Sequence, residues 1–174
     1  MRKSCLAATV LAALTSPVLA ADAVGDWMVA DKIAVVRVAP CAPDKPALCG
    51  NLVWTKGPPR ADKNNPDPAK RSRSVLGMET LLDMKPTSAN RWEGEIYNAE
   101  DGKIYSGSIS LLSENVLRIE GCVLGFLCGG QNWTRAKCEE PPPPAPARRG
   151  TTAPPPAVQP QPQTFPTSCR EAVP

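Results

Sequence analysis

The stretch Asn115–Arg135, NVLRIEGCVLGFLCGGQNWTR, decides how this chain folds. In residues 117–121 (LRIEG) apolar or small residues alternate with charged ones, which is the two-residue period of a strand with one apolar and one polar face. Cys122 and Cys128 then bracket a tight turn, and a second run continues through Trp133. The stretch predicts the last hairpin of a small antiparallel β structure.

The sequence before this hairpin reads as further strands. The clearest pair is 91–98 (RWEGEIYN) and 103–112 (KIYSGSISLL), which flank a turn with Asp-Gly at 101–102. Four further segments read as strands: 24–29, 32–40, 48–55 and 75–84. The last of these could also be a short helix, but we prefer a strand. With the hairpin, the count is about eight strands. The sequence therefore predicts an all-β fold, an eight-stranded antiparallel up-and-down barrel, with a two-sheet sandwich as the alternative.

Three glycines fall on the apolar faces of successive predicted strands: Gly94, Gly107 and Gly121. Inward glycines on neighbouring strands let a sheet bend sharply, which a closing barrel requires. The alternative is that they leave room for an aromatic neighbour such as Trp92.

Residues 1–20 have the pattern of a secretory signal peptide. Arg2 and Lys3 precede an apolar run over 6–14, and the segment ends on Val-Leu-Ala at 18–20. Cys5 precedes the apolar run, so it is not placed for lipid attachment. No later stretch approaches the roughly 20 apolar residues of a transmembrane helix. We expect a periplasmic or secreted protein.

Charge and composition exclude several functions. Without Arg2 and Lys3, the 20 basic residues become 18 against 17 acidic ones, which gives no reason to expect nucleic acid as a partner. The chain has no histidine, the commonest general base and a usual zinc ligand. We therefore expect no enzyme, no catalytic residues, no cofactor and no metal site.

The mature chain keeps six of the seven cysteines. An even number in an exported chain predicts disulfides, and the absence of a CxxC spacing argues against zinc. Proximity along the chain favours two hairpin-closing pairs and leaves a third: Cys41–Cys49, Cys122–Cys128 and Cys138–Cys169. The alternative for Cys169 is a bond to a second chain, which would link a dimer.

Residues 139–174 differ from the rest of the chain in composition. They are rich in proline and contain almost no large apolar side chains, so they predict a disordered tail. A bond from Cys169 to Cys138 would turn this tail into a tethered loop. The expected division is a signal peptide at 1–20, a β-barrel domain at 21–138 and the tail at 139–174.

Several blocks of sequence together resemble a known family. They are GDW (25–27), APC and LCGNLVW (39–54), DKNNPDPAKRSR (62–73), RWEGEIYNAEDGKIYSG (91–107) and GCVLGFLCGGQNWTR (121–135). In this order they resemble the bacterial envelope family catalogued as domain of unknown function twenty-one forty-seven. The resemblance implies a lipocalin-like barrel of the calycin type and assigns no biochemical role.

The calycin likeness also implies one specific contact. In such barrels a Gly-x-Trp on the first strand packs at the closed end beneath an arginine from near the last strand. In this chain the residues are Gly25, Trp27 and Arg135, and an aromatic face under a guanidinium would stabilise the closure.

Candidate ligand-binding residues are of two kinds. Four aromatic residues line a cavity in one interpretation and fill the core in the other: Trp54, Trp92, Tyr105 and Trp133. Arg71 and Arg73 suit an anionic head group at the barrel mouth. The alternative, which we favour, is that the arginines pair with carboxylates such as Asp62 while Asn65 and Asp67 form Asx turns.

Two further features have both a plain and a functional interpretation. The hairpin tip 123–127 (VLGFL) is unusually apolar, and we expect it to fold under as a plug; the alternative is an exposed contact patch for a membrane or a protein. Glu93 and Glu95 share a strand face, and Arg118 and Glu120 share another. We interpret these as solvated charges on the polar face rather than as catalytic groups.

The sequence thus favours non-catalytic binding of a small apolar or amphiphilic ligand inside the barrel. The alternative is a cell-envelope scaffold or protein-interaction module whose barrel is filled and which meets an envelope protein partner through its loops and tail. A continuous apolar cavity of several hundred Å³ would favour binding.

Overall fold

The protein was analysed as a computed structural model that describes residues 22–124, 126–141 and 164–172. These residues form nine β strands and one short 3-10 helix, η1 (Pro68–Lys70). None of the helical structure in this part of the chain is long and apolar enough to cross a bilayer. The predicted signal peptide and residues 142–163 of the predicted tail lie outside the described residues.

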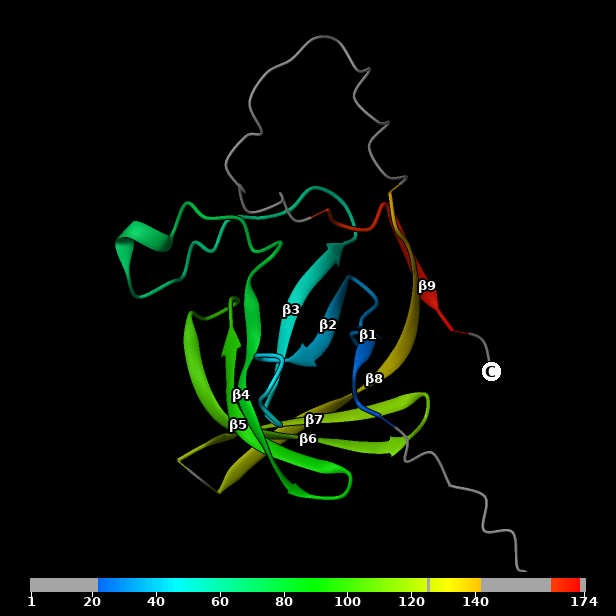
Figure 1. The fold of residues 1–174 in the computed structure, drawn as a ribbon. Coiled ribbons are helices and arrows are strands. Elements are labelled where there is room, and N and C mark those ends of the chain that lie inside the picture. The colour runs from blue at the N-terminus through cyan, green and yellow to red at the C-terminus, as the bar shows by residue number, and fades with distance from the viewer. Residues whose placement is uncertain (1–21, 125, 142–163, 173–174) are drawn as a thin grey trace, which may run out of the picture.

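Eight strands follow one another around a closed antiparallel barrel (Figure 1). Each strand pairs with the next, and β1 closes the barrel by pairing with β8. The strands are β1 (Gly25–Met28), β2 (Ala34–Pro40), β3 (Leu48–Thr55), β4 (Glu79–Ser88), β5 (Arg91–Asn98), β6 (Lys103–Ser113), β7 (Val116–Val123) and β8 (Leu127–Glu139). The predicted eight-stranded up-and-down barrel is confirmed, and the sandwich alternative is wrong.

The fourth strand begins later than the sequence indicated. Val75 and Met78 are buried, but they belong to a bent segment that precedes β4. Its backbone is held by β3, since the Gly77 N–H donates to Leu52 O (2.7 Å) and the Leu52 N–H donates to Met78 O (2.8 Å). Gly77 has a φ of +85°, which favours glycine and ends the segment as a turn rather than as a strand.

The inward glycines lie in one row across the sheet. Gly94 pairs with Gly107, Gly107 with Gly121, and Gly121 with Gly129. A Cβ at Gly94 would lie 2.6 Å from the carbonyl oxygen of Leu82, and one at Gly107 would lie 2.5 Å from that of Glu120. These two glycines therefore permit close backbone approach, as the bending interpretation predicted. A Cβ at Gly121 would make only an ordinary contact, 3.6 Å from Cβ of Tyr105.

A second, smaller apolar cluster lies apart from the main core, where the C-terminal segment covers the barrel. Val35 and Val53 alternate with residues of the main core along β2 and β3, and they pack with Met28, Ala136 and Trp54. Phe165 and Cys169 of the C-terminal segment also pack on this cluster. Ser168–Glu171 forms β9, which pairs with the end of β8 from Ala136 to Glu139.

The prediction that all of 139–174 is disordered is therefore wrong for residues 164–172. The C-terminal half of β8 extends past its pairing with β1, and β9 supplies the missing neighbour. Cys138 and Cys169 face each other in this pairing and form a disulfide within the chain. The other two predicted disulfides are also present, Cys41–Cys49 and Cys122–Cys128. The alternative of a Cys169 bond to a second chain does not describe this structure.

The expectation that the β7–β8 tip folds under as a plug is also wrong. Val123, Leu124, Phe126 and Leu127 are 48–79% exposed. Figure 1 shows this hairpin projecting away from the body of the barrel. The disulfide Cys122–Cys128 ties the two strands together at the base of the tip, which leaves only a short turn, too short to reach back into the interior.

Candidate functional site

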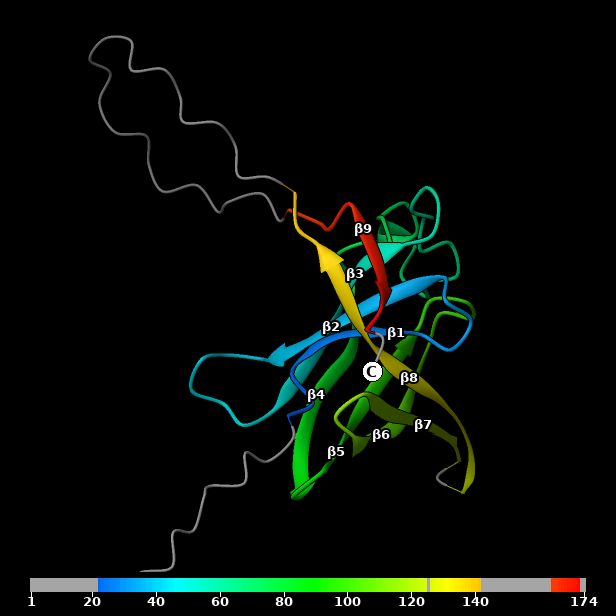
Figure 2. The ribbon, with the colours of Figure 1, turned by 90° about the vertical axis from the view of Figure 1, so that its right-hand side faces the viewer.

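A cavity of about 530 Å³ occupies one end of the barrel interior. It opens among four connections, which are β1–β2, β3–β4, β5–β6 and β7–β8, and Figure 2 shows these connections together on one side of the barrel. Its inner wall is largely apolar: Val36, Leu52, Val75, Met78, Ile96, Ile119 and Trp133. Its rim carries polar and charged groups: Asp31, Lys56, Arg60, Asn98 and Glu100.

The long β3–β4 loop forms one side of this cavity. The loop is fixed by Asp62, whose side chain is fully buried. The hydroxyl of Tyr97 donates to Oδ1 of Asp62 (2.7 Å), and Nδ2 of Asn65 donates to Oδ2 (2.8 Å). Arg73 completes the set with Nε and Nη2, 3.0 and 2.9 Å from Oδ2. Because Tyr97 belongs to β5 and also lines the cavity, this network holds the loop against the barrel wall.

The network perturbs the titration of its members. Burial acts to raise the pKa of Asp62, but the hydrogen bonds from Tyr97, Asn65 and Arg73 outweigh burial, and the pKa of this carboxyl lies below its usual value. Burial, followed by the hydrogen bond to Asp62, raises the pKa of Tyr97. Asp62 is therefore a carboxylate and Tyr97 a phenol at neutral pH.

A second set of contacts joins the same loop to the β5–β6 turn. Nδ2 of Asn64 donates to the carbonyl oxygen of Glu100 (2.7 Å), and Arg60 pairs with the Glu100 carboxylate (2.5 Å). Gly102 has a φ of +70°, and a Cβ there would lie 1.7 Å from the carbonyl oxygen of Asn64. Only glycine fits this turn, since it needs both the positive φ and the missing side chain.

The closed end of the barrel carries the contact implied by the family resemblance. The guanidinium carbon of Arg135 lies 4.1 Å from the centroid of the Trp27 ring. Arg135 also donates to the carbonyl oxygens of Asp22, Val24 and Glu114 at 2.7–2.9 Å. The predicted packing of Trp27 under Arg135 is confirmed.

The candidate aromatic residues separate into two groups. Tyr105 and Trp133 line the cavity. Trp92 packs against the main core without reaching the cavity, and Trp54 packs with the smaller cluster beneath the C-terminal segment. The aromatic pattern alone did not separate these positions, because a tryptophan on either face of a strand can be buried when both faces are covered.

The two candidate arginines contact residues of the β3–β4 loop and do not line the cavity. Arg73 binds Asp62 and lies over the Tyr97 ring at 5.8 Å, and Nε of Arg71 donates to the carbonyl oxygen of Asn65 (2.8 Å). Asn65 and Asp67 each accept a hydrogen bond from the backbone N–H two residues on, as Asx turns do. The interpretation with Arg73 paired to Asp62 describes the structure.

The basic residues that do reach the cavity are Lys56 and Arg60. The sequence did not identify them as candidates, because they precede the matched block at 62–73 and belong to no motif themselves. Their position just after the end of β3 could have indicated that they lie at the cavity opening, since residues that follow a barrel strand are at the rim.

Trp133 has an unusual polar environment. The residue is 5% exposed, and its Nε1–H has no acceptor among the residues that the structure describes. By contrast, Nε1 of Trp27 donates to the carbonyl oxygen of Ala23 (2.8 Å). A buried donor without an acceptor costs about 1–3 kcal/mol, so packing must hold Trp133 in place.

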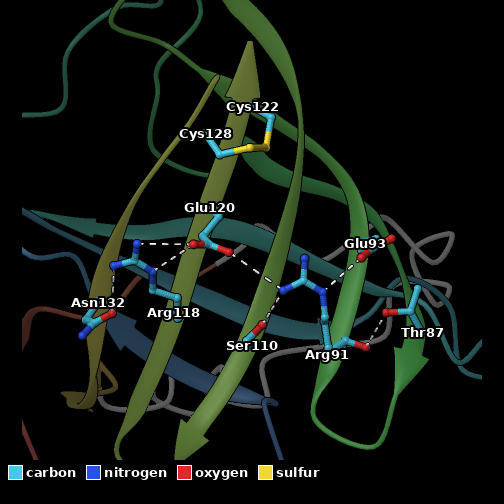
Figure 3. A network of polar contacts seen from close by, with 9 residues as sticks. All are labelled: Thr87, Arg91, Glu93, Ser110, Arg118, Glu120, Cys122, Cys128 and Asn132. Carbon is cyan, nitrogen blue, oxygen red and sulfur yellow. Dashed lines mark hydrogen bonds and ion pairs between the residues drawn. A yellow bond between two sulfur atoms is a disulfide. The ribbon is translucent and has the colours of Figure 1, made fainter. Parts of the chain in front are cut away.

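The charged residues on the outer face of β5–β8 pair with one another (Figure 3). Arg91 contacts Glu93 at 3.0 Å and Glu120 at 3.9 Å, while Arg118 contacts Glu120 at 3.3 Å. Glu95 lies on the same outer face, opposite Ser106. Glu93 and Glu120 are partly exposed and paired with arginines, and Glu95 is exposed, an arrangement typical of a solvated strand surface.

One group of residues in the described part of the chain has the spacing of a metal site, namely Cys41, Cys49 and Glu79. Both sulfur atoms are joined in a disulfide, so neither is available as a thiolate ligand. The group is therefore a disulfide beside a carboxylate.

Comparison with known proteins agrees with this architecture. Residues 25–135 match the model of the family described as an uncharacterized protein conserved in bacteria, DUF2147. A comparison with curated proteins found no match.

Among solved structures, the chain is similar to protein HP1028 from Helicobacter pylori, which is described as belonging to the lipocalin family. The TM-score is 0.59 and the sequence identity is 21%, with 66% of this chain and 82% of that chain covered. At this identity the likeness concerns the fold alone. Because the family model covers residues 25–135, from the start of β1 to the pairing of β8 with β1, the chain belongs to the bacterial family DUF2147 and has a lipocalin-like β-barrel fold.

Proposed function

We propose that this protein is a non-catalytic binding protein that holds one small apolar or amphiphilic molecule inside its barrel. The cavity of about 530 Å³ carries this proposal, because its volume falls within the range of sites that take small ligands. A largely apolar wall with a few polar groups at one end is the usual composition of such sites.

The arrangement of polar groups supports an amphiphile more than a purely apolar molecule. The deep wall contains Ile119 and Trp133, whereas Lys56 and Arg60 lie at the rim. An acyl chain or ring system would occupy the apolar part, and a polar or anionic end would remain near these basic groups and near solvent. Arg60 already pairs with Glu100, so Lys56 is the better placed to meet a new anion.

The competing function, an envelope scaffold with a filled barrel, is less well supported. Of the four aromatic residues that would have filled the interior, Trp54 lies in the cluster under the C-terminal segment and Trp92 packs beside the core without reaching the cavity. A Cβ at Gly129 would meet no atom within 4 Å, and one at Gly121 would meet only Cβ of Tyr105, at 3.6 Å, so no side chain is packed tightly against either glycine. We also propose that the protein works in the periplasm or outside the cell, since three disulfides suit an oxidising compartment.

The proposal is tested by native mass spectrometry of the full chain purified gently from the cells that produce it. Gly121→Leu is the decisive variant, because Gly121 lines the cavity, has no positive φ and leaves room for a side chain. Ser106→Leu is the matched control, since it adds the same side chain to the exposed face of the neighbouring strand.

We expect the natural chain and Ser106→Leu to carry a non-covalent adduct of lipid-like mass, and Gly121→Leu to lack it. An adduct that persists unchanged in folded Gly121→Leu would place the ligand outside the cavity and overturn the proposal.

A further inference from the structure

The β7–β8 tip is the largest group of exposed apolar side chains in the described part of the chain. Its members are consecutive apart from Gly125: Val123, Leu124, Phe126 and Leu127. Leu124 is 79% exposed and Phe126 is 71% exposed, so neither packs against the barrel. Single exposed apolar residues need no explanation, but a cluster at the end of a projecting hairpin does.

The tip is also free of charge and firmly supported. From Gly121 to Thr134 the sequence contains no acidic or basic residue. The disulfide Cys122–Cys128 joins the two strands directly beneath the tip. Moving this turn out of water therefore desolvates no ion, and the bridge limits the conformations that the four apolar side chains can take.

The tip lies at the same end of the barrel as the cavity opening. Gly121 and Gly129, which precede and follow the tip, line the cavity. Two more substantially exposed residues lie at the neighbouring turns of that end, Ile33 in the β1–β2 connection and Ile104 at the start of β6. Figure 2 shows the β7–β8 tip on the same side as the β1–β2 and β5–β6 turns. Leu112, also exposed, lies on β6 toward the opposite end.

We propose that the β7–β8 tip inserts into the surface of a phospholipid bilayer and so brings the cavity opening against the membrane. A bilayer needs only a few apolar side chains at a protruding turn, which enter the boundary between head groups and acyl chains. A stable protein interface needs about 800 Å² from each partner, and four side chains on a narrow convex tip do not supply that area. The inference rests on the proposed function, because it gives an amphiphile a direct path between bilayer and cavity.

Binding of the purified full chain to phosphatidylcholine vesicles tests the proposal, with flotation as the readout. The double variant Leu124→Ser, Phe126→Ser removes the two most exposed apolar groups of the tip. Leu112→Ser is the matched control, since Leu112 is 59% exposed at the other end of the barrel. We expect the double variant to bind vesicles at least about tenfold more weakly, and Leu112→Ser to bind as the natural chain does.

Phe126→Trp supplies an independent readout. The quantity to follow is the difference between the tryptophan fluorescence of this variant and that of the natural chain, which has four tryptophans. This difference should increase and shift to the blue when vesicles are added, and lipids brominated in the acyl chains should quench it. The cavity-filled Gly121→Leu should still bind vesicles, so failure of the ligand proposal and failure of the membrane proposal give different results.

Two outcomes would overturn the proposal. One is vesicle binding that is absent in the natural chain or equal in the double variant. The other is a natural chain that does not bind vesicles but associates with itself in analytical ultracentrifugation, while the double variant stays monomeric. The tip would then be a protein contact.

Discussion

Trp27 and Arg135 are direct partners across the β1–β8 seam, and the guanidinium of Arg135 also lies over the Trp27 ring at 4.1 Å. The pair therefore closes the barrel twice, once through its backbone pairing and once through its side chains. Gly25 allows this approach, since a Cβ there would lie 2.6 Å from Nη1 of Arg135.

Replacing Arg135 by lysine should destabilise the barrel by about 2–3 kcal/mol. Lysine keeps the charge but cannot reach three carbonyl oxygens and cover an indole ring with one planar group. Urea unfolding followed by circular dichroism measures the change. Arg91→Lys, on the outer face, is the control and should cost less than about 1 kcal/mol. Equal losses in the two variants would show that the seam is not special.

The two buried tryptophans Trp27 and Trp133 should differ when each is replaced by phenylalanine. Trp27→Phe loses the hydrogen bond to Ala23 O and weakens the cation–π contact, whereas Trp133→Phe removes a donor that has no acceptor among the described residues. Both lose similar volume, so Trp27→Phe should be more destabilising by about 1–2 kcal/mol. Thermal and urea unfolding of the two variants check this order, and the reverse order would contradict the hydrogen-bond assignment.

The buried carboxylate Asp62 should make stability depend on acid pH. Its folded-state pKa lies below the unfolded value of about 3.9, so its contribution is complete above about pH 5 and is lost as the pH falls through the lowered folded pKa. Asp62→Asn should cost about 2–3 kcal/mol at pH 7 and clearly less at pH 3.

Urea titrations at the two pH values measure this difference. The matched control is Asp83→Asn, an exposed carboxylate paired with Lys85, which should change stability by less than about 1 kcal/mol. A cost for Asp62→Asn that stays constant between pH 7 and pH 3 would mean that the carboxylate is not stabilised by its partners.

Removing the Cys138–Cys169 disulfide should release the C-terminal segment and leave the barrel closed. The double variant Cys138→Ala, Cys169→Ala frees a loop with a sequence separation of 31, for which a loss of about 2–4 kcal/mol is typical. Hydrogen exchange should accelerate over 136–139, where β8 pairs with β9, and remain slow where β8 pairs with β7. Faster exchange throughout β8 would show that the segment is part of the closure itself.

The sequence predicted those parts of the fold that repeat a local pattern. Alternation in 117–121 and the Asp-Gly turn at 101–102 identified the strands, because one buried face imposes a two-residue period. The segment Ser168–Glu171 carries no such pattern. It is ordered by the edge of β8 and by Cys138, which are distant in sequence, so its local residues could not reveal it.

Among the polar contacts of the site, those between residues close in sequence were predictable, and Tyr105 and Trp133 were correctly selected as candidates for the cavity wall. The pairing of Arg73 with Asp62 was foreseen, but Tyr97, which lies 35 residues from Asp62, was not. The exposed tip at 123–127 was misjudged, since an apolar turn can be buried or exposed and only the finished barrel decides which. Lys56 and Arg60 became rim residues through the position of the loop rather than through a motif.

The central claim, a ligand-binding cavity inside the barrel, is tested most directly by fluorescence titration with a dansyl-labelled fatty acid. The account predicts saturable binding to the natural chain, to Ser106→Leu and to the Leu124→Ser, Phe126→Ser tip variant. It predicts binding that is weaker by about tenfold or more in Gly121→Leu, which fills the space beside Tyr105. Undiminished binding to folded Gly121→Leu, or its loss in the tip variant alone, would contradict the account.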